Sequence, residues 1–227
     1  MFISDDPLKK IQQNLSKIQA AYAVMQHCFE QCQIELRKEF GEGIVLDTID
    51  EHTKEAWRIQ WSPLIEEQRE EALNNFVEPE ERGFKYVVSG PIPKYAKLPE
   101  QGFQDDFKIV ARTEGFLPNK LNLSIWFNGT LCGLAASANE CPDPKGVLLI
   151  SLREGHPDKN HPLKGKIAYI IDRVSTNYAK ALGHKIIAYR GPYSDGALTL
   201  HQRMNLKEEK VMISSELSEE CYIKHVI

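Results

Sequence analysis

The sequence has no long hydrophobic run and no excess of basic residues. Its first ten residues, MFISDDPLKK, lack the basic and apolar regions of a secretory signal, and its apolar runs are far shorter than a membrane span. The 28 basic and 32 acidic residues give a net charge of −4, whereas a general nucleic-acid binder needs a basic excess to meet phosphate. We therefore expect a cytoplasmic protein that binds neither membranes nor nucleic acids in general.

The chain also lacks a cysteine framework, because its cysteines follow no regular spacing. There are five, an odd number: Cys28, Cys32, Cys132, Cys141 and Cys221. This pattern is typical of free thiols in a reducing compartment. The first two lie one helical turn apart beside His27, but no second ligand pair accompanies them and a zinc site needs four convergent ligands. We predict no metal site.

The N-terminal part of the chain carries a heptad pattern. Between Asp6 and Phe40 the apolar residues follow one another at alternating steps of three and four, which predicts one long amphipathic helix. They are Leu8, Ile11, Leu15, Ile18, Tyr22, Met25, Phe29, Cys32 and Leu36. Such a helix either packs on its own domain or pairs with a second copy in a homodimer, because a 3.5-residue period favours supercoiling. We divide the chain into this helix, residues 1–42, and a domain over residues 43–227.

The remaining sequence alternates strand and helix signals, which predicts a mixed α/β sheet. A hairpin is expected around Asn128-Gly129, in a type I′ turn. The expected strands are 43–49, 121–127, 131–136, 146–152, 185–189, 210–214 and 221–226. The expected helices are 51–76, interrupted near Ser62-Pro63, then 165–182 and 195–204. Between them, residues 77–104 read as an irregular insertion with one strand at 84–88.

The segment from Leu152 to Tyr169 runs from an apolar strand through a polar loop into a helix that opens around Gly165. Main-chain N–H groups at a helix N-terminus have no intrahelical acceptor and carry the positive end of the helix dipole, so they suit a phosphate. Lys159, Lys164 and Lys166 add positive charge. The same features also fit a solvated helix cap, and both interpretations stay open on these residues alone.

The wider order of elements resembles the Gcn5-related N-acetyltransferase (GNAT) superfamily. The run HPLKGKIAYIIDRV is similar to its acetyl-CoA loop, with Gly165 at the first glycine position and Pro162 and Ile167 at the outer ones. The segment DDFKIVART, the hairpin IWFNGTLCGLA, the strand ending REG, and Gly191-Pro192 add to the resemblance. It covers roughly residues 43–227 and leaves out the N-terminal helix.

The resemblance implies a GNAT-like, mostly antiparallel central sheet flanked by helices and splayed between its fourth and fifth strands, 147–153 and 185–189. It also implies an acetyl-CoA-dependent N-acyltransferase that moves an acetyl group to an unidentified primary amine by direct attack, without a metal. The implied cofactor contacts are Leu152, Arg153, Lys164, Gly165, Lys166, Ile167 and Ala168.

The reaction needs a group that takes the proton of the amine and a group that protonates the leaving thiolate. Glu154 follows the fourth strand and matches a Glu common there in the resembling subgroup, so we expect it to be the base. His201 stands where the family usually has a Tyr that acts as the general acid, and we expect His201 to be the acid here. His156 and His161 are alternatives for base or phosphate contact. The alternative function is a catalytically weak or inactive GNAT-fold module that works through its N-terminal helix.

Overall fold

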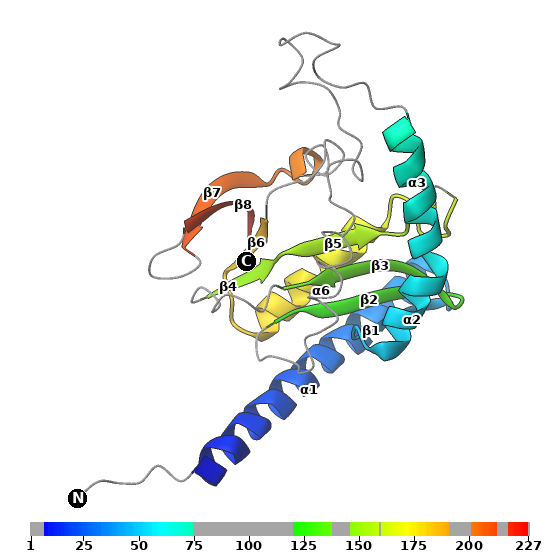
Figure 1. Cartoon of the computed structure of the whole chain (residues 1–227). Helices are drawn as coiled ribbons and strands as arrows, with labels where there is room; N and C mark the ends of the chain where they lie inside the picture. Colours follow the sequence, from blue (N-terminus) through cyan, green and yellow to red (C-terminus); the bar gives the residue numbers. More distant parts are fainter. Residues whose placement is uncertain are drawn as a thin grey trace, which may run out of the picture.

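The structure is a computed structural model, and it describes residues 7–74, 120–137, 146–158, 160–190, 201–212 and 218–226 (Figure 1). The expected irregular segment 77–104, its strand 84–88 and the segment DDFKIVART lie outside the described residues. So does most of the short helix expected at 195–204, of which only the last part is described.

The described strands form two four-stranded sheets. The first has the order β1-β2-β3-β5, with β1 (Ile44–Asp47), β2 (Asn122–Phe127), β3 (Thr130–Ala136) and β5 (Leu152–Gly155). The second has the order β4-β6-β8-β7, with β4 (Val147–Ile150), β6 (Ile186–Arg190), β8 (Ser218–His225) and β7 (Lys207–Met212). Of the strand pairs described, β4–β6 is parallel and the rest are antiparallel. This confirms the predicted mixed, mostly antiparallel sheet.

One continuous run of chain belongs to both sheets. Its first half, β4, pairs with β6 as far as Ile150 and Tyr189, and its second half, β5, pairs with β3 from Leu152 and Ala136 onward. At the join, the Ser151 N–H donates to the carbonyl of Ala136 at 2.9 Å. The single strand expected at 146–152 is therefore two strands with different partners. Because β5 leaves β6 at this point, the structure confirms the predicted splay.

The β2–β3 hairpin has the turn that its sequence predicts. Asn128 and Gly129 both have positive φ, 49° and 79°, as a type I′ turn requires. Asn128 N–H also donates to the carbonyl of Gly43 at 2.9 Å, so the turn is fastened to the residue before β1.

Among the described residues, four helices cover the two faces of the β1-β2-β3-β5 sheet: α1 (Pro7–Phe40), α2 (Glu51–Gln60), α3 (Ser62–Asn74) and α6 (Ile167–Ala181). The break that Ser62-Pro63 predicts falls at Trp61, between α2 and α3. Asp50 caps α2 by accepting a hydrogen bond from the Thr53 N–H at 2.8 Å. Helices α1 and α6 share the main hydrophobic cluster with one sheet face, whereas α2 and α3 form a smaller cluster with the other.

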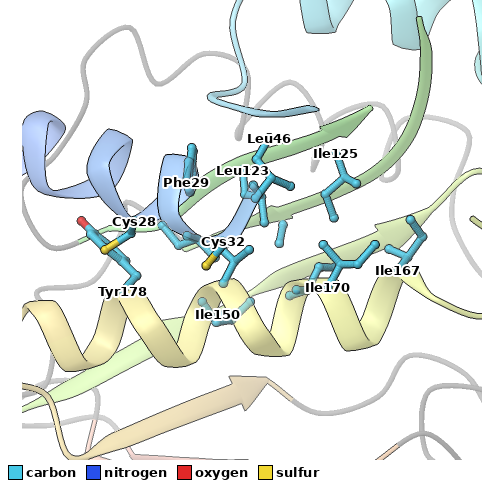
Figure 2. Packing of buried hydrophobic residues seen from close by; sticks show 14 of the residues in the cluster. Cys28, Phe29, Cys32, Leu46, Leu123, Ile125, Ile150, Ile167, Ile170 and Tyr178 are labelled. Atoms are coloured by element: carbon cyan, nitrogen blue, oxygen red, sulfur yellow. The ribbon is translucent and has the colours of Figure 1, made fainter. Parts of the chain in front are cut away.

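The second half of α1 is part of the main core. Figure 2 shows its side chains between β2 and α6, and Met25, Phe29, Cys32 and Leu36 are each at most 1% exposed. The first half extends away from the sheets (Figure 1), and there Leu15 is 53% exposed and Tyr22 41%. The heptad pattern therefore packs on its own domain along the second half of the helix only.

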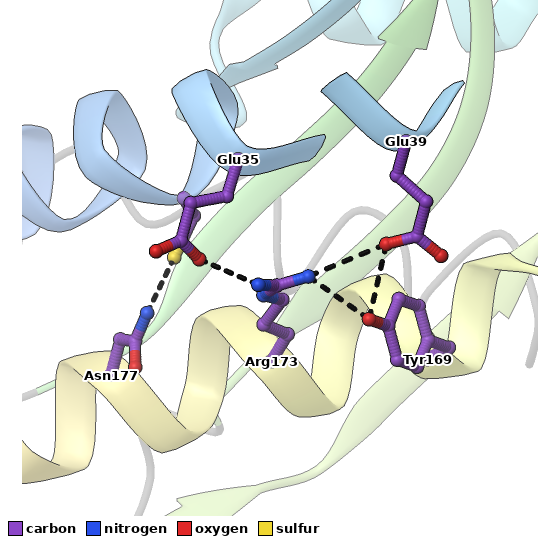
Figure 3. Close-up of polar contacts among 6 residues, drawn as sticks. Glu35, Glu39, Tyr169, Arg173 and Asn177 are labelled. Atoms are coloured by element: carbon purple, nitrogen blue, oxygen red, sulfur yellow. Dashed lines mark hydrogen bonds and ion pairs between the residues drawn. The ribbon is translucent and has the colours of Figure 1, made fainter. Parts of the chain in front are cut away.

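Polar contacts also join α1 to α6 (Figure 3). Arg173 of α6 pairs with Glu35 at 2.6 Å and with Glu39 at 3.4 Å. The Asn177 amide donates to Cys32 Sγ at 3.1 Å. Burial, followed by the neighbouring Cys32, raises the pKa of Cys28 to about 11, which suits a structural thiol better than a nucleophile.

Candidate functional site

The N-terminus of α6 is built to leave main-chain donors exposed. A turn over residues 161–166 leads into it, and Gly165 within that turn has φ of 74°, a conformation that favours glycine. Lys166 precedes the helix without a side-chain cap, and the first turn contains no acidic residue. Within the described residues, the N–H groups of Gly165, Ile167 and Ala168 have no main-chain acceptor, whereas the Lys166 N–H between them donates to the Leu163 carbonyl at 3.0 Å. The first N–H of the helix that has a main-chain acceptor is that of Ile170, 3.0 Å from the Lys166 carbonyl.

The structure brings five of the expected cofactor contacts together at this helix N-terminus. Lys164, Gly165 and Lys166 are exposed, Ala168 is half-buried, and the Ile167 side chain is buried against the sheet. Leu152 and Arg153 lie apart from these five, on β5. Leu152 packs with the α2–α3 cluster, and the next side chain along the strand, Arg153, points to the opposite face.

Arg153 stands at the splay and contacts two residues across it. Its guanidinium carbon lies 4.2 Å from the centre of the Tyr189 ring on β6. One of its terminal nitrogens makes a close contact with Nε2 of His201. Two predicted site residues from distant parts of the sequence, one a cofactor contact and the other an acid, are thus direct neighbours.

Behind Tyr189 the contacts continue into α6. The Tyr189 hydroxyl donates to Asp172 at 3.0 Å, and Lys224 of β8 donates to the other oxygen of the same carboxylate at 2.5 Å. Burial and the Asp172 charge raise the pKa of Tyr189, so this phenol stays neutral. Sequence reasoning missed Tyr189, Asp172 and Lys224, because each sits in an ordinary strand or helix pattern and none belongs to a motif.

His201 is fully buried and neutral. Its ring lies 4.3 Å from the Tyr222 ring, centre to centre. Burial, and then the Arg153 charge, lower its pKa to about 4. Because a guanidinium offers only donors, Nε2 is the acceptor and the imidazole proton sits on Nδ1. That Nδ1 has no hydrogen-bond partner among the described residues.

Glu154 and His201 do not share a face of the sheet. Glu154 is half-buried on β5 opposite Leu134 of β3. Side chains alternate along a strand, so Glu154 points to the α2–α3 face, whereas Arg153 and its partner His201 lie on the α6 face. The expected base and acid are therefore on opposite sides of the diverging strands.

The two alternative histidines lie in the segment that leads from β5 to α6. His156 and His161 are both buried, with ring centres 5.6 Å apart, and His156 also packs edge-on against Trp61. The Asp158 N–H donates to Nδ1 of His156 at 3.0 Å. Burial lowers the pKa of both imidazoles. Through Trp61, this segment contacts the junction of α2 and α3.

Among the residues that the structure describes, no group of three or more His, Cys, Asp or Glu side chains is placed to hold a metal ion. No helix in the described ranges combines the length and apolar character needed to cross a membrane.

No family model matches the sequence, and no curated protein matches it. Among solved structures, the chain is similar to a GNAT-family acetyltransferase from Staphylococcus aureus Mu50, at 10% identity and a TM-score of 0.45, over 81% of this chain and 99% of that one. It is also similar to the PaiA N-acetyltransferase of Thermoplasma acidophilum in complex with coenzyme A, at 14% identity and a TM-score of 0.44, over 80% and 98%. A third similar structure is an acetyltransferase from Streptococcus agalactiae 2603, at 11% identity and a TM-score of 0.43, over 81% and 99%. In the chain itself, the strand pairing has the splay that the resemblance to the GNAT superfamily implied.

Proposed function

We propose that the protein is an acetyl-CoA-dependent N-acyltransferase of the GNAT type, which moves an acetyl group to a primary amine by direct attack. The observation that supports this best is the uncapped N-terminus of α6, with lysines beside it and the diverging strands β5 and β6 next to the same helix. A fold hosts many activities, so the function depends on this site and not on the sheet alone.

Acetyl-CoA would be held at two places. The N–H groups of Gly165, Ile167 and Ala168, with the ammonium groups of Lys164 and Lys166, suit its pyrophosphate, because the donors converge at the positive end of a helix dipole. Leu152 and Arg153 would contact the pantetheine arm through the main chain of β5, which is the edge strand of its sheet among the described strands. The residues present therefore fit the cofactor.

The cofactor supplies an acetyl group already activated as a thioester, and the protein positions an amine and takes its proton. We assign the base role to Glu154, whose half-buried carboxylate lies on β5 beside the splay. Proton transfer to a positioned side chain contributes typically about 10² to 10⁴ in rate. The amine would thus approach from the α2–α3 face, on which Glu154 lies.

The low pKa of His201 guides the role that we assign to it. An imidazole whose pKa is about 4 is almost entirely neutral near pH 7, so His201 does not serve as an imidazolium. In the tautomer that Arg153 imposes, its buried Nδ1–H remains a donor. We assign it a hydrogen bond to the sulfur as negative charge develops there, in the manner of a preorganised electrostatic donor.

A second candidate role, assembly through α1, is favoured by the exposed first half of that helix. Leu15 and Tyr22 lie seven residues apart on one stripe, and both are exposed. A heptad spacing on a helix that extends from the domain suits pairing with a second copy. A homodimer is compatible with the acyltransferase and also with a GNAT-fold module that has lost catalysis.

Isothermal titration of the full chain with acetyl-CoA tests the enzyme proposal, and α6 offers a matched pair of variants. Gly165 and Gly183 flank the helix at its two ends, with φ of 74° and 72°, and a Cβ at either position would meet nothing within 4 Å. Gly165→Glu and Gly183→Glu therefore carry the same backbone strain and the same charge. We expect Gly165→Glu to weaken acetyl-CoA binding at least tenfold and Gly183→Glu to leave it within twofold. Absence of binding by the unaltered protein overturns the enzyme proposal and favours the alternative, a GNAT-fold module without catalysis.

A further inference from the structure

Arg153 forms no ion pair with an acidic side chain among the described residues. Its guanidinium lies on the face of Tyr189 and touches the neutral ring of His201, and neither of these neighbours carries a negative charge. A half-buried charge without a counter-charge is costly, so such groups in proteins are normally paired or bind a ligand. The contrast with Arg173 is direct, since that arginine pairs with both Glu35 and Glu39.

The nearest acids are committed elsewhere. Asp172 accepts from the Lys224 ammonium at 2.5 Å and from the Tyr189 hydroxyl at 3.0 Å, which uses both of its oxygens. Glu154 is the next residue along β5, and strand alternation puts its side chain on the other face. Burial lowers the pKa of Arg153, and Tyr189, Asp172 and Glu154 offset this effect only in part.

The neighbours also hold the guanidinium in one orientation. The Tyr189 ring covers one face of the planar group, and His201 takes a single donor at one corner. A guanidinium has five N–H donors in a rigid fork, so donors remain in its plane for a planar anion. His201 adds a buried Nδ1–H with no partner among the described residues.

This cationic group is separate from the helix N-terminus that suits a pyrophosphate. Through Tyr189 it is connected to Asp172, which is five residues into α6 from Ile167, or about 7.5 Å along the helix axis. It lies instead at the splay, where the two reactants would meet.

We propose that Arg153 binds a carboxylate carried by one of the two reactants, with Tyr189 and His201 fixing the plane of its guanidinium. This inference rests on the proposed acyltransferase function and deepens it by naming a substrate class. The carboxylate belongs either to the acceptor, as in an amino acid, or to the acyl chain of the donor, as in a dicarboxylic acyl-CoA. Both sources present the same planar anion to a bidentate donor.

The experiment compares matched reactants in the full-length protein. The acceptor arm pairs amino acids with their amides, using acetyl-CoA as donor. The donor arm pairs succinyl-CoA with butyryl-CoA, which have acyl chains of similar length with and without a carboxylate. Coenzyme A release gives kcat/KM for each. We expect at least a tenfold preference for the carboxylate form in one arm, and the arm that shows it identifies the source.

Three variants assign the preference to the guanidinium. Arg153→Met keeps much of the side-chain volume and should abolish the preference. Arg153→Lys keeps the positive charge but loses the planar pair of N–H donors, so it should retain only part of the preference. Arg173→Met, the control, removes an arginine of α6 that is paired with acids of α1 and should leave the preference intact. A folded Arg153→Met protein that keeps the preference overturns the proposal, as does the lack of a preference in both arms.

The acyltransferase proposal and the carboxylate proposal fail in different measurements. Failure of acetyl-CoA to bind in calorimetry overturns the acyltransferase proposal. In that case the side-chain N–H resonance of Arg153 is followed by NMR while succinate and free amino acids are added. A saturable shift that is absent in Arg153→Met keeps a carboxylate site at this position, and no shift overturns it.

Discussion

Gly133 of β3 lies directly beneath Ile167, the first residue of α6. A Cβ at position 133 would stand 2.7 Å from Ile167 Cγ2 and 3.3 Å from Ile125 Cδ1. The neighbouring glycine on β5 differs, since a Cβ at Gly155 would be 3.8 Å from Ile167, an ordinary contact. The absence of a single methyl group on β3 thus sets how closely the N-terminus of α6 approaches the sheet.

We expect Gly133→Ala to destabilise the protein by about 1–3 kcal/mol, the usual cost of overpacking a core, and to weaken acetyl-CoA binding because it displaces the start of α6. Gly155→Ala is the matched control and should cost less than 1 kcal/mol by comparison with that range. Urea unfolding and calorimetry measure the two effects. Equal stability and binding in both variants would show that the position of α6 does not depend on Gly133.

Glu154→Gln should lower the turnover number by about 10², in the range for loss of a general base, while acetyl-CoA affinity stays the same. The amide keeps the size of the side chain and removes its ability to take a proton. Glu209→Gln, at an exposed position of β7, is the control for a lost carboxylate. Turnover of the folded Glu154→Gln protein equal to that of the unaltered enzyme would remove Glu154 from the base role.

The stability of the protein should depend on His201 in the acid range. Its pKa is about 4 in the folded protein and about 6.5 when unfolded, so between these values the unfolded chain binds a proton that the folded chain does not. The contribution of His201 to the free energy of unfolding is therefore fully present above about pH 6.5. It is lost as the pH drops toward 4, by up to about 1.4 kcal/mol per pH unit for one proton. His156 and His161 act in the same direction.

Urea unfolding at several pH values between 7 and 4 measures this dependence. His201→Asn removes one of these three histidines. It should reduce the slope of the free energy of unfolding against pH by nearly the amount that one proton contributes, while the contribution of the other two histidines persists. A curve with unchanged slope in the variant would mean that His201 titrates normally in the folded state.

If the exposed half of α1 pairs two chains, Leu15→Lys together with Tyr22→Lys should convert a dimer to a monomer with little change in melting temperature. Ile34→Lys changes an equally exposed residue in the second half of the helix, 51% against 53% for Leu15, and should leave the dimer intact. Sedimentation velocity gives the oligomeric state. A full-length protein that is monomeric at high micromolar concentration contradicts pairing.

Local patterns predicted most of the described elements. The heptad pattern between Asp6 and Phe40 delimits α1 within one residue of its observed ends, and Asn128-Gly129 identified the hairpin turn. These signals work because each depends on the preferences of a few neighbouring residues. The heptad pattern could not show that only its second half is buried, since its repeat is the same along the whole helix and the packing partner, α6, is more than a hundred residues away.

Long-range pairing accounts for what the sequence did not reveal at the site. Arg153 and His201 were both expected to be site residues, for different reasons, but 48 residues separate them and no local pattern places one beside the other. The break in the strand 146–152 has the same origin. Its apolar run is continuous, and the change of partner at Ser151 follows from the positions of β3 and β6.

The strand that both sheets share constrains how the protein can change in length. With one residue deleted between Ile150 and Leu152, β4 could keep its register with β6 only if β5 slipped by one position against β3, and the reverse also holds. A one-residue slip turns every side chain of a strand to the other face, so Arg153 would leave His201 and Glu154 would take its place. Insertions and deletions that are harmless in surface turns should therefore be lethal to the site here, and divergence in this stretch is restricted to substitution.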